Sequence, residues 1–566
     1  MRILHCLTRL SHRSKLAKPL TFAFLTVFLT SCTVLSPKAP PCVESAALYR
    51  LADMRQIDEP TFSKALACDN LKTVELALIS LGRIGDEQAS DLILPLLKHS
   101  NVKVREAAAF ALGISLHKPA TANLIEQLEQ EKNSKVRAAM VLAIGNLGGD
   151  RSVETLARLI EQSKDAQVAN AAMQGLGIMS VFHRHLLTGD TEIEVARVID
   201  RLRDKDTALM ASFLLARVPL LRDPHVPDVI SIMREQSNSL NAETQAFIIR
   251  ALSKLGHKDI TPFLLEKITS NVSGIQLAAA QALGIRTLIK TEHVQLLNDL
   301  ALEEKPALQV TLLQSGRHWM TPQTLRTLRD SGNTWVQSEA FLATNDKAQP
   351  EVQKLVKAWL ESDDPNHQRA VIQYFVELNI PPVLKQLAES DKEIIRIGAQ
   401  RALKTYQEPK TEPMATPTEL PVLLGKGPAK VKLITTKGDI VIRLFKDTPY
   451  TSANFIRLVE SGFYENTYFH RVIPSFVAQG GSKLGDGSGS VGYSIREELN
   501  QRSHRTGTIG MATAGKDTGG AQFFFNLAPN LHLDSNYTVF GEVVEGMDIV
   551  MSLEQNDQIN SAEIIK

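Results

Sequence analysis

The segment from Tyr468 to Gly481, YFHRVIPSFVAQGG, places a histidine and an arginine inside an apolar, strand-like run that ends in two glycines. An arginine in such a strand is often a structural partner in an ion pair. Arg471 has a second use, because its guanidinium stays charged, is planar and is weakly hydrated, so it can donate hydrogen bonds at the edge of an apolar pocket. The composition of the segment leaves both roles open.

The residues around this segment predict the strands that would hold it. VKLITTKGDIVIRLF, from Val431 to Phe445, alternates apolar and polar residues on both sides of Lys437 and Gly438, which predicts a hairpin. TPYTSANFIRLVESGFY predicts a helix that begins at Pro449 and ends at Gly462. Short aromatic-rich strands with two short helices and no βαβ pattern predict a closed β-barrel with capping helices over residues 431–566.

Three motifs follow one another within these residues: FHRVIPSFVAQGG, GTIGMATAGKDTGGAQFFFNLAP and YTVFGEVVEGMDIV. Across residues 431–566, without gaps, the chain resembles the cyclophilin family of peptidyl-prolyl cis/trans isomerases. The resemblance implies an enzyme that accelerates rotation about X-Pro bonds and uses no cofactor and no metal ion. It implies catalytic roles for Arg471, Gln479 and Phe476. It implies substrate contacts for His470, Val477, Ala512, Thr513, Gln522, Phe524, His532, Leu533 and Tyr537.

The resemblance also assigns the individual roles. Arg471 is implied to donate a hydrogen bond to the proline nitrogen, and Gln479 to orient that arginine and to bond the substrate backbone. The proline pocket is implied to be formed by Phe476, Val477, Phe524 and Leu533. For His470 a substrate contact and a purely local structural role both stay open.

Some positions depart from the family pattern. Val477 stands where many members have methionine, Thr513 where most have asparagine, and Tyr537 where histidine is common. His532 takes the place of a tryptophan that contacts cyclosporin in eukaryotic members, so sensitivity to that drug stays open. The alternative to catalysis is an envelope scaffold or chaperone whose domain binds Pro-containing peptides without turning them over. The intact set of Arg471, Gln479 and Phe524 favours catalysis.

The middle of the chain repeats. Small residues follow the anchors Thr73, Val104, Val136 and Val168 at a constant distance, and the anchors lie 31, 32 and 32 residues apart. This period, with apolar positions at helical spacing, predicts antiparallel helix pairs, and the segment from 46 to 405 resembles a HEAT-type solenoid of about ten to eleven repeats. Such an arm favours binding of a client or an assembly, while a spacer without a ligand stays open. The aromatic rings of Trp319, Trp335 and Trp359 are expected in its core.

Proline marks the boundary between the two regions. Residues 406–430 carry Pro409, Pro413, Pro417, Pro421 and Pro428. This spacing forbids a regular helix and predicts an extended, semi-rigid linker, so we expect the C-terminal domain to fold and act alone.

The first 31 residues predict a signal peptide, with a basic start and an apolar run from Leu20 to Leu29 that is too short to span a bilayer. Leu29-Thr30-Ser31-Cys32 resembles the lipobox of bacterial lipoproteins, which implies acylation of Cys32, a tether over residues 32–45 and a lipid anchor on the periplasmic face of the outer membrane. An ordinary signal peptide is the alternative.

The composition of the chain gives no support for a nucleic-acid-binding protein or a metalloprotein. Of 566 residues, 63 are Lys or Arg and 62 are Asp or Glu, so net charge gives no argument for a nucleic-acid partner. Cys42 and Cys68 are either a disulfide or two thiols. His183 and His185 are a weak metal pair without a third ligand nearby, so we predict no metal site. Client identity and oligomeric state are not predicted.

Overall fold

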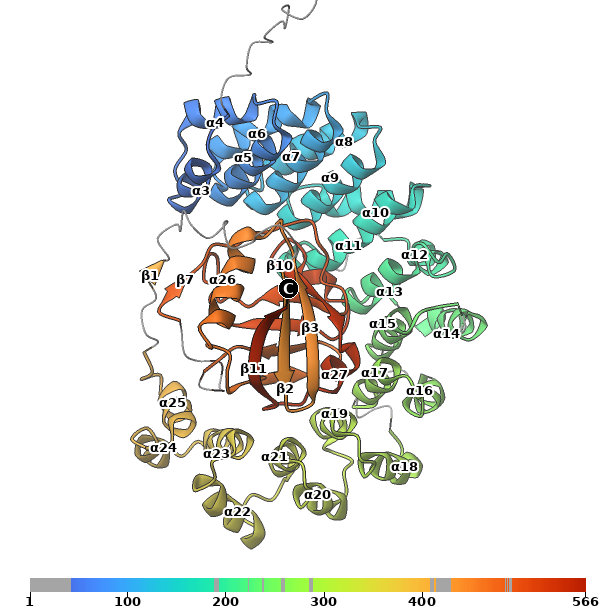
Figure 1. Ribbon diagram of the computed structural model, residues 1–566. Coiled ribbons are helices and arrows are strands. Elements are labelled where there is room, and N and C mark those ends of the chain that lie inside the picture. Colours follow the sequence, from blue (N-terminus) through green and yellow to red (C-terminus); the bar gives the residue numbers. More distant parts are fainter. Residues whose placement is uncertain are drawn as a thin grey trace, which may run out of the picture.

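The computed structural model describes residues 42–187, 193–221, 223–236, 239–255, 260–284, 289–407, 412–413, 429–483, 485, 487 and 491–565. The predicted signal peptide, Cys32 and most of the predicted proline-rich linker lie outside these residues. The described chain forms a helical arc and a smaller β-domain, and the arc curves around the domain (Figure 1).

Alternate helices of the arc form an inner layer and an outer layer (Figure 1). The inner helices are α3 (Ser45–Asp53), α5 (Leu71–Ile84), α7 (Val102–Ser115), α9 (Ser134–Leu147), α11 (Ala166–Phe182), α13 (Ala208–Arg217), α15 (Ala242–Ser253), α17 (Ser273–Leu283), α19 (Pro306–Gly316), α21 (Thr334–Ala343), α23 (Pro365–Glu377) and α25 (Glu393–Ala402). The outer helices are α4 (Glu59–Leu66), α6 (Glu87–Ile93), α8 (Ala120–Gln130), α10 (Ser152–Gln162), α12 (Val195–Arg201), α14 (Val226–Glu235), α16 (Thr261–Ile268), α18 (Thr291–Ala301), α20 (Pro322–Arg329), α22 (Pro350–Leu360) and α24 (Pro381–Leu387). Short 3₁₀ turns join some of them, including η1 (Leu94–Lys98), η2 (Arg184–Leu186) and η3 (Asp223–His225).

Capping residues begin many of the inner helices. The side chains of Asn70, Asn101, Asn133 and Asp165 each accept a hydrogen bond from a backbone N–H in the first turn of α5, α7, α9 and α11. These bonds satisfy donors that have no partner inside the helix. In these four repeats an Asn or Asp before the apolar run therefore marks where the inner helix begins.

Small residues set the distance between neighbouring inner helices. A Cβ added to Gly145 on α9 would lie 2.5 Å from the Cα of Gly175 on α11, so the two helices meet backbone to backbone. The anchors of the sequence repeat, from Thr73 to Val168, are all buried. Each repeat thus packs on the next, as the period predicts, and Trp319, Trp335 and Trp359 are buried as expected.

Cys42 and Cys68 form a disulfide, with their Cα atoms 6.0 Å apart. Of the two alternatives that the sequence left open, the structure shows the disulfide and not two free thiols. It joins the segment before α3 to the residues after α4. Among the described residues, the helices are too short or too polar for any of them to cross a membrane.

The β-domain is built on one curled sheet in the order β4-β11-β2-β3-β10-β8-β9-β6-β5. Its strands are β2 (Lys430–Thr435), β3 (Gly438–Leu444), β4 (Thr467–Tyr468), β5 (Arg471–Ile473), β6 (Val477–Gly480), β8 (Thr508–Met511), β9 (Phe523–Asn526), β10 (Val539–Glu545) and β11 (Gln558–Ile565). All its pairings are antiparallel, and a separate parallel pair joins β1 (Glu412–Pro413) to β7 (Tyr493–Ser494).

The local predictions for this domain agree with the structure. β2 and β3 form the hairpin at Lys437 and Gly438, and the helix after it is α26 (Pro449–Glu460). A second short helix, α27 (Met547–Ser552), precedes β11. The predicted closure of the barrel is not established, because the strand ladders of the described residues leave β4 and β5 as sheet edges.

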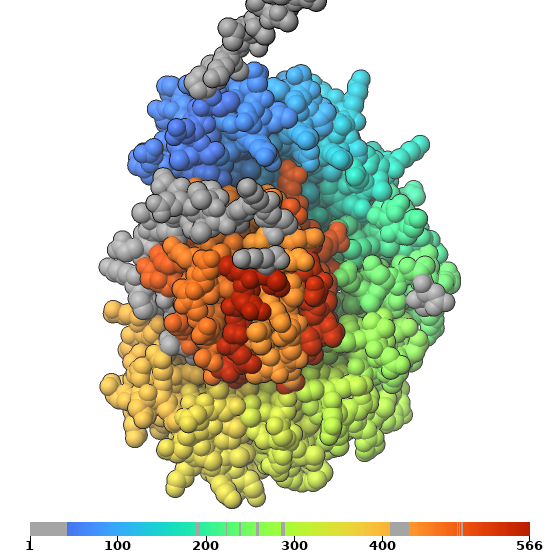
Figure 2. Space-filling model, in the orientation of Figure 1, coloured from blue at the N-terminus to red at the C-terminus, as the bar shows by residue number. Residues whose placement is uncertain are grey.

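The β-domain lies inside the helical arc (Figures 1 and 2). Direct contacts span the arc: Arg83 of α5 to Asp517, Gln174 of α11 to Asp534, Arg250 of α15 to the Ser475 carbonyl, and Asn366 of α23 to the Gln555 carbonyl. The β-domain is therefore docked on the arm, while the expectation that it folds and acts alone stays a prediction. The proline-rich composition predicts an extended linker, but it does not tell where the chain returns.

Candidate active site

Sheet register brings the predicted catalytic residues into one row. Arg471 on β5 lies opposite Gln479 on β6, Gln479 lies opposite Phe524 on β9, and Phe524 lies opposite Gly510 on β8. Residues directly opposite one another in a sheet point to the same face. A Cβ on Gly510 would lie only 2.3 Å from Cζ of Phe524, so glycine leaves the space that this ring occupies.

A chain of hydrogen bonds orients the arginine. Arg471 Nη1 donates to Gln479 Oε1 at 3.3 Å, and Gln479 Nε2 donates to Gln522 Oε1 at 3.0 Å. Gln522 in turn donates to the carbonyl of Gly487 at 2.8 Å. Partial burial lowers the pKa of Arg471, and its guanidinium lies 5.7 Å from the centre of the Phe476 ring. The guanidinium is thus held at the rim of an aromatic surface.

The residues of the predicted proline pocket come from β6, from β9, from the turn before β6 and from the 3₁₀ turn at Leu531–Leu533. Val477 and Phe524 are buried, while Phe476 and Leu533 are partly exposed. Tyr537 meets the Phe524 ring edge to face at 6.3 Å. The structure therefore brings these predicted residues together around an apolar surface next to Arg471.

Sequence reasoning missed the residues that support this pocket. His504 is fully buried and stacks on Phe524 at 5.6 Å, and burial lowers its pKa to about 4, so it is neutral near pH 7. Asn530 donates to the carbonyl of Phe476 at 2.9 Å and to Asn526 at 2.8 Å. His504 lies just before the second motif and Asn530 just after it, and this position at the edges of the motif is the one feature visible in the sequence; their burial is seen only in the structure.

The other predicted residues lie at different distances from the row. Ala512 and Thr513 follow β8 and are partly exposed, and the Ala512 N–H donates to the Gln522 carbonyl at 3.0 Å. His470 is buried, and a Cβ on Gly487 would lie 3.2 Å from its ring. This position favours the local structural role for His470.

His532 contacts the helical arc. It lies in η7 (Leu531–Leu533), its ring stacks with that of Phe476 at 6.0 Å, and Arg217 of α13 donates to its Nδ1 at 2.7 Å. Burial, and then the charge of Arg217, lowers the pKa of His532 to about 3, so it accepts this bond as a neutral ring. The arc therefore takes part in the wall of the site.

A second contact from the arc lies beside η7. Gln174 of α11 donates to Asp534 at 2.7 Å, and the backbone N–H of His504 donates to the same carboxyl at 2.8 Å. Burial outweighs these bonds and raises the pKa of Asp534 to about 6. The arc thus supports the segment that carries His532 and Leu533.

The arrangement offers an apolar pocket sized by aromatic rings and a fixed cationic donor at its rim. Such an arrangement can hold a proline ring and can favour the twisted amide, in which the nitrogen lone pair is no longer delocalised into the carbonyl.

Each of the two regions is similar to known sequences. Residues 430–566 match the sequence profile of cyclophilin type peptidyl-prolyl cis-trans isomerase/CLD, and residues 121–212 match that of HEAT repeats. A peptidyl-prolyl cis-trans isomerase of Synechococcus elongatus is 46% identical over 136 residues, which are 24% of this chain and 94% of the relative. One from Helicobacter pylori is 46% identical over 132 residues, which are 22% of this chain and 81% of the relative. The crystal structure of a Cryptosporidium parvum cyclophilin type isomerase in the presence of the dipeptide Ala-Pro shares 28% identity, covers 24% of this chain and 99% of its own, and has a TM-score of 0.24.

Proposed function

Because the chain belongs to the cyclophilin-type peptidyl-prolyl cis-trans isomerase family, we propose that it isomerises X-Pro bonds of exported client proteins, with Arg471 as the donor to the prolyl nitrogen. Its activity as a peptidyl-prolyl cis-trans isomerase follows from the family. The role of each residue, the cellular location and the recruitment of clients are the proposal.

The chemistry requires little more than a site that prefers the twisted amide. Rotation about an X-Pro bond has a barrier of roughly 20 kcal/mol, because the nitrogen lone pair is delocalised into the carbonyl. In the twisted state the nitrogen is pyramidal and accepts a hydrogen bond. An acceleration of ~10⁵ corresponds to about 7 kcal/mol, and a charge-assisted bond made only in that state contributes a large share.

The row of Arg471, Gln479 and Phe524 is the observation that carries this proposal. Gln479 accepts from Arg471 and is itself held by Gln522, so the guanidinium is oriented before a substrate arrives. Phe524 supplies the apolar surface on the same face. Orientation in advance removes the reorganisation cost from the chemical step.

Substitution of the arginine tests these roles. Arg471→Lys and Arg471→Ala should lower kcat/KM on an Ala-Pro peptide by roughly 10² to 10³, about 3 to 4 kcal/mol, while peptide binding changes far less. Phe524→Ala should weaken binding together with turnover. Exchange NMR measures both quantities. Arg443→Lys is the matched control, because Arg443 is an exposed arginine that pairs with Glu542 on the same domain.

The outcomes separate the alternatives. Near-normal exchange in Arg471→Ala would show that the donor is not this arginine. A wild-type chain that binds the peptide without accelerating its exchange would favour the scaffold hypothesis.

Export and lipid anchoring are supported by two features. The residues before Cys32 resemble a lipobox, and Thr33 follows the cysteine where aspartate would imply retention at the inner membrane. The disulfide between Cys42 and Cys68 is typical of an oxidising compartment such as the periplasm. Cys32→Ala should abolish incorporation of labelled palmitate and release the protein from the outer-membrane fraction. Labelling that survives in this variant would rule out the anchor.

The arm is proposed to recruit clients. HEAT repeats expose long curved surfaces that bind proteins. Part of the concave surface here holds the isomerase domain, so we expect recruitment where the arm and the site meet.

A further inference from the structure

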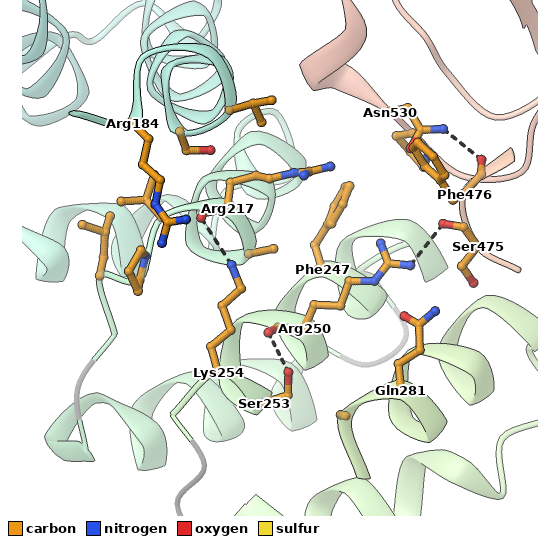
Figure 3. Close-up of a pocket in the computed structure, with 18 of the residues that line it drawn as sticks. Arg184, Arg217, Phe247, Arg250, Ser253, Lys254, Gln281, Ser475, Phe476 and Asn530 are labelled. Atoms are coloured by element: carbon orange, nitrogen blue, oxygen red, sulfur yellow. Dashed lines mark hydrogen bonds between the residues drawn. The ribbon is translucent and has the colours of Figure 1, made fainter. Parts of the chain in front are cut away.

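A cavity of about 910 Å³ lies between the arm and the turn that joins β5 to β6, beside the hydrogen bond from Arg250 to the Ser475 carbonyl. On the domain side it is lined by Ile473 to Phe476 and by Asn530. On the arm side it is lined by the ends of α11 and α13 and by α15. Figure 3 shows side chains from both walls around this space. The lining therefore includes Phe476, a residue of the predicted proline pocket.

Four cationic side chains line the cavity from the arm: Arg184, Arg217, Arg250 and Lys254 (Figure 3). No Asp or Glu occurs among the described residues that line it. Neutral groups are the hydrogen-bond partners: Arg217 donates to His532 at 2.7 Å, Arg250 to the Ser475 carbonyl at 3.2 Å and Lys254 to the Arg217 carbonyl at 3.3 Å. Three of these cations are thus hydrogen-bonded to neutral protein groups, and within the described structure no acidic residue at the cavity neutralises their charge.

The pKa shifts of these groups agree with that geometry. Burial, and then the charge of Arg217, lowers the pKa of Arg250 to about 10. The pKa of Lys254 is lowered by burial and then by Arg217 and Arg184. Like charges brought together in a partly dry space favour entry of an anion, because an anion relieves both effects.

Another part of the same interface contains paired charges. Near α3 and α5, Arg83 lies between Asp53 and Asp517, and Arg496 pairs with Asp53 at 2.6 Å. There the two regions are in direct contact. At the cavity, by contrast, Arg217 and Arg250 contact the domain through neutral groups, and no ion pair to an acidic residue is present there among the described residues.

We propose that this cavity binds an acidic segment of the client polypeptide, next to the proline that the isomerase site holds. The inference rests on the proposed function, because it takes the Phe476 pocket as the proline site. A polypeptide fits better than a small anion, because Val181, Leu187 and Phe247 give the cavity an apolar wall beside its cations.

The distances suit residues close to the proline. Arg250 bonds the residue before Phe476, and Arg217 bonds a histidine whose ring is 6.0 Å from that of Phe476. An extended chain rises ~3.3 Å per residue, so an acidic side chain about three residues from the proline reaches the cations. The arm thereby becomes a specificity element for clients with carboxylates near proline.

Matched peptides test the proposal on the full chain. One peptide carries a single Ala-Pro bond with glutamates about three residues away on both sides, and its twin carries glutamines. Exchange NMR should give a kcat/KM roughly tenfold higher for the acidic peptide at low salt, since two such ion pairs are worth about that factor. The preference should arise in KM and should shrink at ~0.5 M salt.

A variant that lacks two exposed cations of the cavity tests their contribution to this preference. Arg184→Gln with Lys254→Gln removes charge without touching the isomerase domain, and should reduce the preference to about threefold or less while glutamine-peptide turnover stays unchanged. Lys164→Gln with Lys205→Gln removes the same charge from exposed positions away from the cavity and should keep the full preference.

The results distinguish this inference from the proposed function. Equal kcat/KM for the two peptides, or an undiminished preference in the Arg184 and Lys254 variant, overturns the inference. Loss of preference in the control variant also overturns it, since the effect would then come from overall charge. Turnover of the glutamine peptide that still depends on Arg471 leaves the proposed function standing in each case.

Discussion

Replacing Asp517 with asparagine removes a carboxylate that joins the arm to the isomerase domain. Asp517 pairs with Arg55 and with Arg83, at 2.9 Å for the latter, and accepts from the backbone N–H of Glu497 at 3.0 Å. Asparagine has the same shape and tolerates the positive φ of 58° at this position. The substitution therefore changes charge with little change in backbone strain.

The magnitude follows from the burial of Arg83, whose side chain is 5% exposed. Breaking a buried ion pair costs about 3 to 5 kcal/mol, because the remaining charge has lost its partner. Two features reduce this cost. Asp53 still pairs with Arg83 at 3.1 Å in the variant. Burial, and then the charge of Asp517, raises the pKa of Glu497 to about 7, and the variant removes this repulsion between the two carboxylates. We expect a loss of about 2 kcal/mol, or roughly thirtyfold in the equilibrium for docking of the domain.

Hydrogen exchange of the full chain measures this effect at a distance. Residues 529–536 pack against α11 through Gln174, whereas Asp517 contacts Arg83 of α5, so their amides report release of the domain from another part of the arm. Their exchange should rise in Asp517→Asn, and small-angle scattering should show a larger radius of gyration. Asp439→Asn is the control, because its ion pair with Lys432 lies within the β2–β3 hairpin. Unchanged exchange in Asp517→Asn would refute the assigned role of this interface.

Two further predictions concern the site. Gly510→Ala would place a methyl group 2.3 Å from the Phe524 ring and should lower kcat/KM at least about tenfold in the exchange assay. Gly274→Ala is the control, because the space around Gly274 is open, and it should leave kcat/KM unchanged. Equal turnover in both variants would contradict the packing argument. His532 has a pKa lowered from 6.5 to about 3 by burial and then by Arg217, so the unfolded chain takes up this proton first and stability should fall as pH drops below about 6.5. His532→Gln should give a shallower decline in urea unfolding across that range, and identical slopes would show that His532 does not contribute.

Part of the site could be predicted because it is local. Arg471 and Gln479 are joined by a tight turn, so the hairpin that the motif encodes also places them opposite each other. Phe524 and Gly510 come from strands far along the chain, and the sheet alone brings them into the row. His504 escaped prediction because its role is to support an aromatic ring from behind, a contact without a sequence spacing.

The repeat period, the capping Asn and Asp residues and the small residues are sequence properties, and they determine a stack of helix pairs by nearest-neighbour packing. The hairpin and α26 are likewise determined by turn residues and alternation. The curvature of the arc is not determined in this way, because it is the sum of small rotations between repeats over the whole length of the arc.

Only the tertiary structure decided that the arc surrounds the isomerase domain and that Arg217 and Arg250, about one repeat apart, reach the turn at Phe476. In the sequence these arginines look like ordinary charged positions on helices. Their role depends on curvature, since a straighter arc would leave them in solvent and His532 without its partner.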